Sequence, residues 1–176
     1  MLKKDIKPHS EKYVFFYFET KLDPETKKHI VNYCIAHYFN GDERIFGNID
    51  EFCKWVFNKA KHAGYTFIAH YGKGYDFQFI PEWLIAHGVK PNIIHNGLKI
   101  MQLEVKHNYN IRFIDSISFT LIPLRDFPKT FGLTELAKGY FPHKFNTDEN
   151  QHYVGQYPEK KLLWIRRNEE SGQRKI

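Results

Sequence analysis

The pattern of apolar and polar positions predicts several short strands. Residues 13–19 and 30–39 are rich in aromatic and β-branched side chains and predict two strands. The polar turn at 21–24 would join them as a hairpin. Further apolar runs between turn signals predict strands at 65–70, 93–94, 99–105 and 111–115.

Two segments have the spacing of amphipathic helices. The first covers residues 49–60, with Asn48 as its N-cap and Gly64 as its stop signal. The second covers residues 76–87 and ends at Gly88. Because strands and helices are mixed along the chain, we expect an α/β protein with a mixed sheet and helices packed on it.

Composition narrows the possible partners only slightly. The chain has 176 residues and a formal net charge of +6, which is compatible with an anionic partner and equally with scattered solvated charge. No apolar run reaches the length of a membrane span, so we expect a soluble protein without a membrane partner. The two cysteines lack C-x-x-C spacing, which favours buried thiols in a reducing, intracellular compartment.

Two carboxylates are candidates for metal chemistry. Glu19 ends the apolar run 13–19, and Asp76 opens a helix after the Gly72-Lys73-Gly74 loop, which lacks the phosphate-binding P-loop pattern. Asp76 alone is compatible with simple helix capping. A strand-ending Glu and a helix-opening Asp are also compatible with a Mg or Mn site at the edge of a sheet, because these ions prefer hard oxygen ligands. Both interpretations stay open at this point.

Ordered motifs give the chain a resemblance to a known family. Residues 17–20 read YFET, where the family has D-x-E-T, and residues 70–76 read HYGKGYD, close to H-N-x-K-x-Y/F-D. Residues 113–146 match the segment that follows. From about residue 12 to 158 the chain resembles the 3′–5′ exonuclease domain of protein-primed family B DNA polymerases of phages, linear plasmids and mobile elements. The resemblance implies a ribonuclease H-like α/β fold over 1–158 with an incomplete C-terminal part. The polar composition of 159–176 predicts a divergent, disordered tail.

The resemblance also implies roles for individual residues. It implies catalytic roles for Glu19, Asp76 and Lys138, and Mg or Mn binding by Glu19 and Asp76. Contacts to single-stranded DNA at the primer 3′ end are implied for six residues: Thr20, His70, Lys73, Tyr75, Ser116 and Ile117. A terminal protein is the further partner that it implies for the parent polymerase, which acts in DNA replication.

Two motif positions depart from the family. Tyr17 replaces the first aspartate, and Tyr71 replaces the asparagine of the second motif. A phenol has a pKa near 10, so it is neutral at pH 7 and cannot bridge two metal ions as a carboxylate does. The third motif, Y-x-x-x-D, is missing, since no aspartate lies four residues after Tyr157 or any later tyrosine.

Three functions are compatible with these residues. The first is an exonuclease-domain fragment of a DNA polymerase with lost or severely weakened cleavage and no polymerase domain in this chain. The second is an active single-stranded exonuclease in which Glu19 and Asp76 hold one metal ion. The third is a non-catalytic module that binds single-stranded DNA through Lys73, Tyr75 and Ser116 together with Lys138. We expect the first of these.

Overall fold

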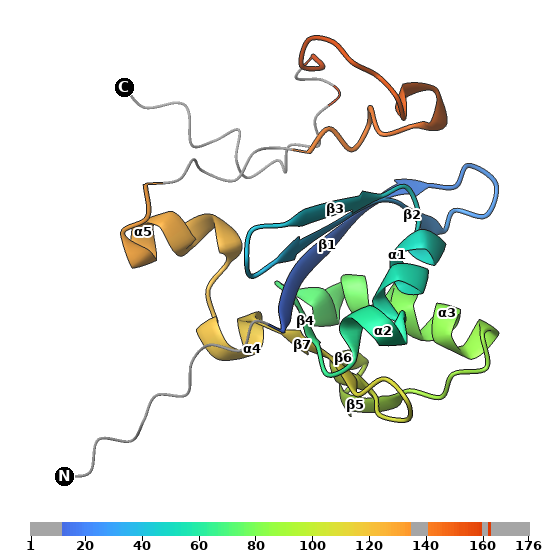
Figure 1. Cartoon of the computed structure of the whole chain (residues 1–176). Helices are drawn as coiled ribbons and strands as arrows, with labels where there is room; N and C mark the ends of the chain where they lie inside the picture. Colours follow the sequence, from blue (N-terminus) through green and yellow to red (C-terminus); the bar gives the residue numbers. More distant parts are fainter. Residues whose placement is uncertain (1–11, 135–140, 160–161, 163–176) are drawn as a thin grey trace. The chain divides into compact units, whose positions relative to one another are not determined.

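The computed structural model describes residues 12–134, 141–159 and 162 (Figure 1). The described residues form two compact units. The first consists of residues 12–19 and 31–121, and the second of 20–30 and the described residues from 122 onward. No helix in the described ranges is both long and apolar enough to cross a lipid bilayer.

Seven strands form one mixed sheet in the described part of the chain. Their order across the sheet is β3-β2-β1-β4-β7-β6-β5. β1 pairs in parallel with β4, and β4 with β7, while β3 and β6 pair with their partners in antiparallel orientation. The strands are β1 (Tyr13–Leu22), β2 (His29–Tyr38), β3 (Glu43–Phe46), β4 (Thr66–Ala69), β5 (Asn92–Asn96), β6 (Lys99–Val105) and β7 (Ile111–Asp115).

Alternation along β1 gives the sheet a buried face and an open face. Val14, Phe16 and Phe18 are buried, whereas Phe15 and Tyr17 between them are exposed. This period of two is the consequence of successive strand side chains pointing to opposite faces. The buried face therefore carries the core, and the other face is left for contacts with solvent or ligands.

The core is aromatic and lies between the sheet and two helices, α1 (Ile49–Val56) and α3 (Phe79–Ala86). Phe16 is at its centre, with ring centroids 5.3 Å from Phe52 on α1, 5.9 Å from Phe113 on β7 and 6.3 Å from Phe77. Such ring pairs add to the free energy of burial, so the core fixes where the strand ends lie.

The predicted helix at 49–60 is wrong in its continuity. Asn48 caps α1 by accepting a hydrogen bond from the Glu51 N–H, as expected, but α1 ends at Val56 and a second short helix, α2 (Lys59–His62), follows. Asn58 caps α2, and buried His62 contacts the Trp55 carbonyl through Nδ1 at 2.8 Å. The break is stabilised because these side chains satisfy the backbone groups at both new helix ends.

Of the remaining elements, the helix predicted at 76–87 is present in modified form, whereas β3 was not predicted. The 76–87 helix is a 3₁₀ turn, η2 (Asp76–Gln78), that continues into α3. β3 was not predicted, because its four residues lack alternation and depend on pairing with β2. The segment after β7 contains short turns: α4 (Ile117–Thr120), η3 (Leu124–Asp126), α5 (Phe127–Phe131) and η4 (Asp148–Asn150). The 3₁₀ turn η1 (Gly72–Gly74) precedes η2.

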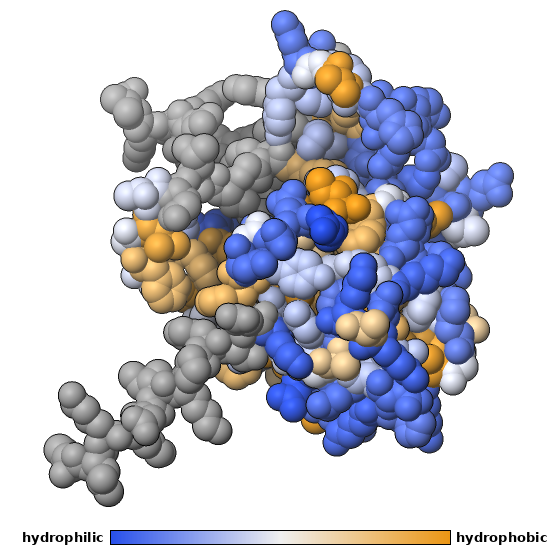
Figure 2. Space-filling view, viewed as in Figure 1, coloured by the Kyte–Doolittle hydropathy of each residue, from blue (hydrophilic) through white to orange (hydrophobic). Residues whose placement is uncertain are grey.

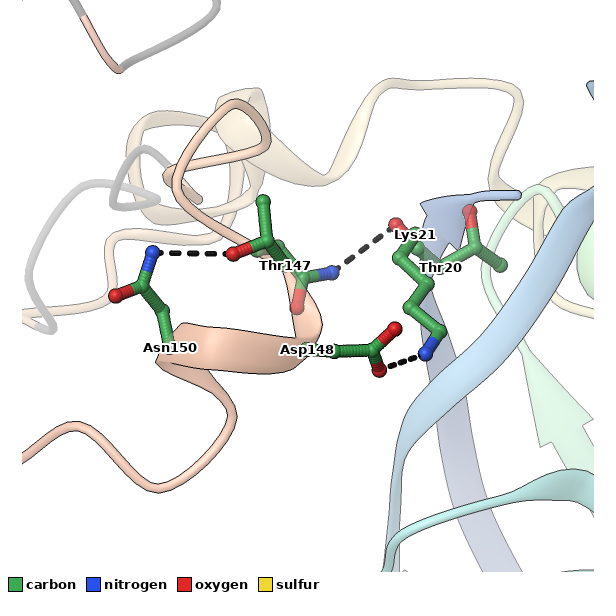
Figure 3. A network of polar contacts seen from close by, with 6 residues as sticks. Thr20, Lys21, Thr147, Asp148 and Asn150 are labelled. Atoms are coloured by element: carbon green, nitrogen blue, oxygen red, sulfur yellow. Dashed lines mark hydrogen bonds and ion pairs between the residues drawn. The ribbon is translucent and has the colours of Figure 1, made fainter. Parts of the chain in front are cut away.

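The second unit is held by polar contacts around the tip of the β1–β2 hairpin (Figure 3). Lys21 forms an ion pair with Asp148, and the Asn146 side-chain amide donates a hydrogen bond to the Thr20 carbonyl at 3.0 Å. Residues more than a hundred positions apart therefore meet in this unit.

The cysteines are buried, and the surface seen in Figure 2 is mainly polar. Cys34 and Cys53 are both free thiols in the core, as expected. On the face shown in Figure 2, polar residues predominate and apolar ones gather in separate islands. Apolar residues scattered in this way are ordinary on a protein surface, so exposure alone does not mark a functional site.

Candidate functional site

The end of β1 places Tyr17 and Glu19 on the open face of the sheet. Tyr17 is 46% exposed, and Glu19, two residues later, shares its face. Partial burial raises the pKa of the Tyr17 phenol, and the nearby Tyr33, Glu19 and Glu43 raise it further. Tyr17 is therefore a neutral phenol at pH 7, surrounded by acidic groups.

Asp76 lies against the backbone of the same strand. Asp76 is 6% exposed, and its Oδ1 accepts a hydrogen bond from the Phe18 N–H at 2.8 Å. The paired register of β1 with β4 ends at Phe15 and Ile68, so Phe18 lies beyond that ladder. Asp76 thus accepts a backbone N–H that does not take part in the β1–β4 ladder. This N–H belongs to Phe18, the residue directly before Glu19.

Among the residues that the structure describes, the donors around Glu19 and Asp76 do not fit a two-metal site. Tyr17 offers a neutral phenol instead of a bridging carboxylate, and one Asp76 oxygen already accepts the Phe18 N–H. In the ranges that the structure describes, no cluster of three or more His, Cys, Asp or Glu side chains could hold a metal ion. Lys138, the third residue with an implied catalytic role, lies outside the described residues.

Asp115 organises the second motif. It ends β7, is 1% exposed, and accepts three backbone hydrogen bonds: Oδ1 from Tyr71 at 2.8 Å and Ile117 at 3.1 Å, and Oδ2 from Lys73 at 2.9 Å. Successive N–H groups around an anion form a nest, and this one is filled by the protein's own carboxylate. The Gly72-Lys73-Gly74 loop is therefore a turn held by Asp115. The Lys73 N–H is used by this carboxylate, in keeping with the lack of a phosphate-binding P-loop pattern in the sequence.

Sequence reasoning did not identify this role of Asp115. An aspartate at the end of a buried strand was the available signal, but its three donors are separated from it by as many as 44 positions. Only the fold shows that they converge.

His70 and Ser116 meet, although they come from different motif segments. His70 Nδ1 lies 2.9 Å from Ser116 Oγ, and that hydroxyl donates to the Ala69 carbonyl at 3.2 Å. Because a serine has one hydroxyl proton, His70 Nδ1–H is the donor to Ser116 Oγ. The two implied DNA contacts are thus joined to each other and to the end of β4.

The other residues with implied DNA contacts are spread over several elements. The Tyr75 ring is partly buried and packs edge-on against Phe79 at 5.4 Å. Ile117 opens α4, next to Ser116. Thr20 belongs to the second unit, where its Oγ1 lies 2.9 Å from His29 Nδ1. Among the residues with implied DNA contacts, His70 and Ser116 contact each other, and the Lys73 backbone is held by Asp115.

The two departures from the family motifs have different surroundings. Tyr71 has a φ of 69° and is 51% exposed, whereas Tyr17 lies in a regular strand. The left-handed region is uncommon for a non-glycine residue and favours asparagine. The clamp by Asp115 keeps Tyr71 in this conformation.

Comparison with known proteins identifies the family. The model for DNA polymerase type B, organellar and viral, matches residues 56–174. The chain belongs to this family. A search of curated proteins finds no match.

Solved structures of type B polymerases have the same fold. Phi29 DNA polymerase complexed with single-stranded DNA matches with a TM-score of 0.64 and 22% identity over 77% of this chain and 26% of that chain. Its complex with primer-template DNA matches with a TM-score of 0.63 at 22% identity, over 76% of this chain and 26% of that one. The family B polymerase of the archaeon Pyrobaculum calidifontis matches with a TM-score of 0.51 and 15% identity over 73% and 19%.

The solved structures confirm the predicted α/β class, with a mixed sheet flanked by helices, and the family model confirms the predicted relationship to family B DNA polymerases. The type B chain spans about a quarter of the length of the Phi29 polymerase that it matches. The structural match is therefore limited to one region of the Phi29 polymerase.

Proposed function

We propose that this chain is the exonuclease-domain part of a family B DNA polymerase. In this proposal the chain binds single-stranded DNA, but its 3′–5′ exonuclease activity is lost or severely weakened. The observation that carries the proposal is Tyr17. The resemblance implies a metal-bridging acid at this position, two residues before Glu19, and a phenol is neutral at pH 7.

The chemistry of hydrolysis explains why this one position matters. In two-metal cleavage, carboxylates hold two cations about 3.5–4 Å apart and offset their mutual repulsion. A neutral phenol provides none of that negative charge. Glu19 and Asp76 would be the oxygen ligands for a remaining Mg or Mn ion, whose role would be to activate water, and Asp76 shares its carboxylate with Phe18.

Binding of DNA is proposed on separate grounds. The solved relatives include Phi29 DNA polymerase complexed with single-stranded and with primer-template DNA. In this chain, the His70–Ser116 contact and the clamped loop with Lys73 and Tyr75 support a surface for a primer 3′ end. A terminal protein would be a partner of the parent polymerase.

A cleavage assay tests the proposal. A single-stranded oligonucleotide labelled at its 5′ end is incubated with the full chain and Mg or Mn, and the products are separated on a denaturing gel. We expect no shortening from the 3′ end beyond a protein-free control, together with salt-sensitive retention of the probe in a filter-binding assay.

Two outcomes would overturn parts of the proposal. Metal-dependent shortening that Glu19→Ala abolishes would establish an active exonuclease instead. Failure to retain the probe at low salt would exclude DNA binding. The double variant Tyr17→Asp with Tyr71→Asn should regain cleavage only when an acid of the third motif is also available to the site.

A further inference from the structure

Tyr71 is an exposed aromatic side chain on a fixed backbone. Its N–H and that of Lys73 both donate to the buried Asp115 carboxylate, at 2.8 Å and 2.9 Å. Charge-assisted bonds of this kind are stronger than neutral ones, so the turn is pre-organised. The point from which the Tyr71 side chain projects is therefore set before any ligand binds.

The ring itself is also supported. A Cβ added to Gly74 would lie 2.5 Å from Tyr71 Cε1 and 2.9 Å from Cδ1, so the ring lies directly on the glycine backbone. The Tyr71 side chain nevertheless remains half exposed. Glycine at this position allows the ring to rest against the turn while the rest of its surface stays open to solvent.

The charge beside the ring suits an anionic partner. Lys73 lies two residues away on the same turn, and no ion pair involves its ammonium group within the described ranges. Tyr17, the other exposed tyrosine at a motif position, lies near Glu19 and Glu43, which would repel a phosphate. The acid at Tyr71, Asp115, is 1% exposed and already accepts three backbone N–H groups, so a nucleic-acid strand is favoured at Tyr71 rather than at Tyr17.

We propose that Tyr71 is a stacking platform for one unpaired base of single-stranded nucleic acid, with Lys73 contacting the adjoining phosphate, and that this contact needs no metal ion. The proposal rests on the proposed function, because it concerns how the same surface binds DNA. Aromatic side chains stack on any base, and such stacking is independent of base sequence.

The main test uses a variant that removes the ring without straining the turn. Asparagine tolerates the left-handed conformation, so Tyr71→Asn keeps the backbone that Asp115 holds. The probe is a fluorescein-labelled oligothymidine, titrated with the full chain in EDTA and followed by fluorescence anisotropy. We expect Tyr71→Asn to bind about tenfold more weakly than the natural chain, and Tyr71→Trp to bind at least as tightly as the natural chain.

Tyr153 provides a matched control. Its side chain is also 51% exposed, but its hydroxyl donates to the Gln156 carbonyl and its ring packs against Phe145. Tyr153→Ala should bind the probe as the natural chain does. An equal loss in both variants would show a general effect of removing an aromatic side chain and would overturn the proposal.

A second probe separates stacking from charge. An oligonucleotide of equal length with abasic residues keeps the phosphates and removes the bases. The natural chain should bind it about as weakly as Tyr71→Asn binds oligothymidine, and Tyr71→Asn should lose little further affinity. Equal binding of both probes by the natural chain would overturn the stacking role.

The results also distinguish this proposal from the proposed function. If the natural chain binds oligothymidine and Tyr71→Asn binds equally well, only the stacking role fails. If the natural chain does not bind, the DNA-binding part of the proposed function fails with it. Cleavage in Mg would contradict the proposed loss of activity and leave the result in EDTA unchanged.

Discussion

Tyr17 and Tyr71 are the two positions at which the resemblance leads us to expect an acid and an asparagine, and the chain holds them in different ways. Tyr17 lies on a regular strand, with buried Phe16 and Phe18 on either side. Tyr71 lies in a left-handed turn whose backbone is held by Asp115. A strand fixes side chains through its pleat, so a substitution on the open face changes chemistry without changing the backbone. A turn depends on a distant partner, so its geometry belongs to the tertiary structure.

The largest loss of stability is expected for a substitution on the buried face of strand β1. Phe16→Ala removes a buried ring at the centre of the aromatic core and should destabilise the fold by about 3–5 kcal/mol. Phe15→Ala, one residue away on the open face, should cost less than about 1 kcal/mol. Urea unfolding followed by circular dichroism measures both. Similar losses would contradict the assignment of the two faces.

The next effect concerns the turn. Asp115→Ala would leave the partly buried N–H groups of Tyr71, Lys73 and Ile117 without their carboxylate acceptor. We expect a loss of about 2–4 kcal/mol in the free energy of unfolding, because three partly buried backbone donors lose a charged acceptor together. Urea unfolding is again the measurement.

Asp126→Ala is the control for Asp115. Asp126 is exposed and pairs loosely with Arg125 at 3.8 Å, so its replacement should change stability by less than about 0.5 kcal/mol. If Asp115→Ala is equally mild, the turn does not depend on the carboxylate, and the contrast between strand and turn disappears.

The smallest effect is a pH dependence at Tyr17. Its pKa is raised in the folded state, so the stabilising contribution of the neutral phenol is fully present below about pH 10 and is lost as the pH rises through the raised pKa. Tyr17→Phe should therefore flatten part of the fall in stability above pH 10, while Tyr33 and Tyr38, whose pKa values burial also raises, retain the rest. The effect is small because Tyr17 is nearly half exposed.

Denaturant unfolding at pH 7 and at alkaline pH checks this expectation. At pH 7 the variant and the natural chain should differ by less than about 0.5 kcal/mol. A steeper alkaline loss in Tyr17→Phe would mean that the phenol is stabilised as the anion, contrary to the acidic surroundings described above.

Local patterns accounted for much of the fold. The β1–β2 hairpin, the Asn48 cap and strands β4 to β7 were predicted because alternation, capping and turn residues are properties of neighbouring positions. β3 and the break at Asn58 were not predicted, because a short strand needs its pairing partner and a helix break needs contacts from outside the helix. Propensity is a weak guide where tertiary contacts decide.

The sequence by itself determined which chemical groups the candidate site contains: the acids Glu19 and Asp76, and a neutral phenol at Tyr17. Only the tertiary structure decided what they and their neighbours contact. The Asp76–Phe18 bond spans 58 positions and the Asp115–Lys73 bond 42, and no local pattern encodes such pairs. The physical reason is that a carboxylate accepts hydrogen bonds from the N–H groups that lie within reach in the folded chain. Which groups lie within reach depends on how the sheet and the loop pack around the core.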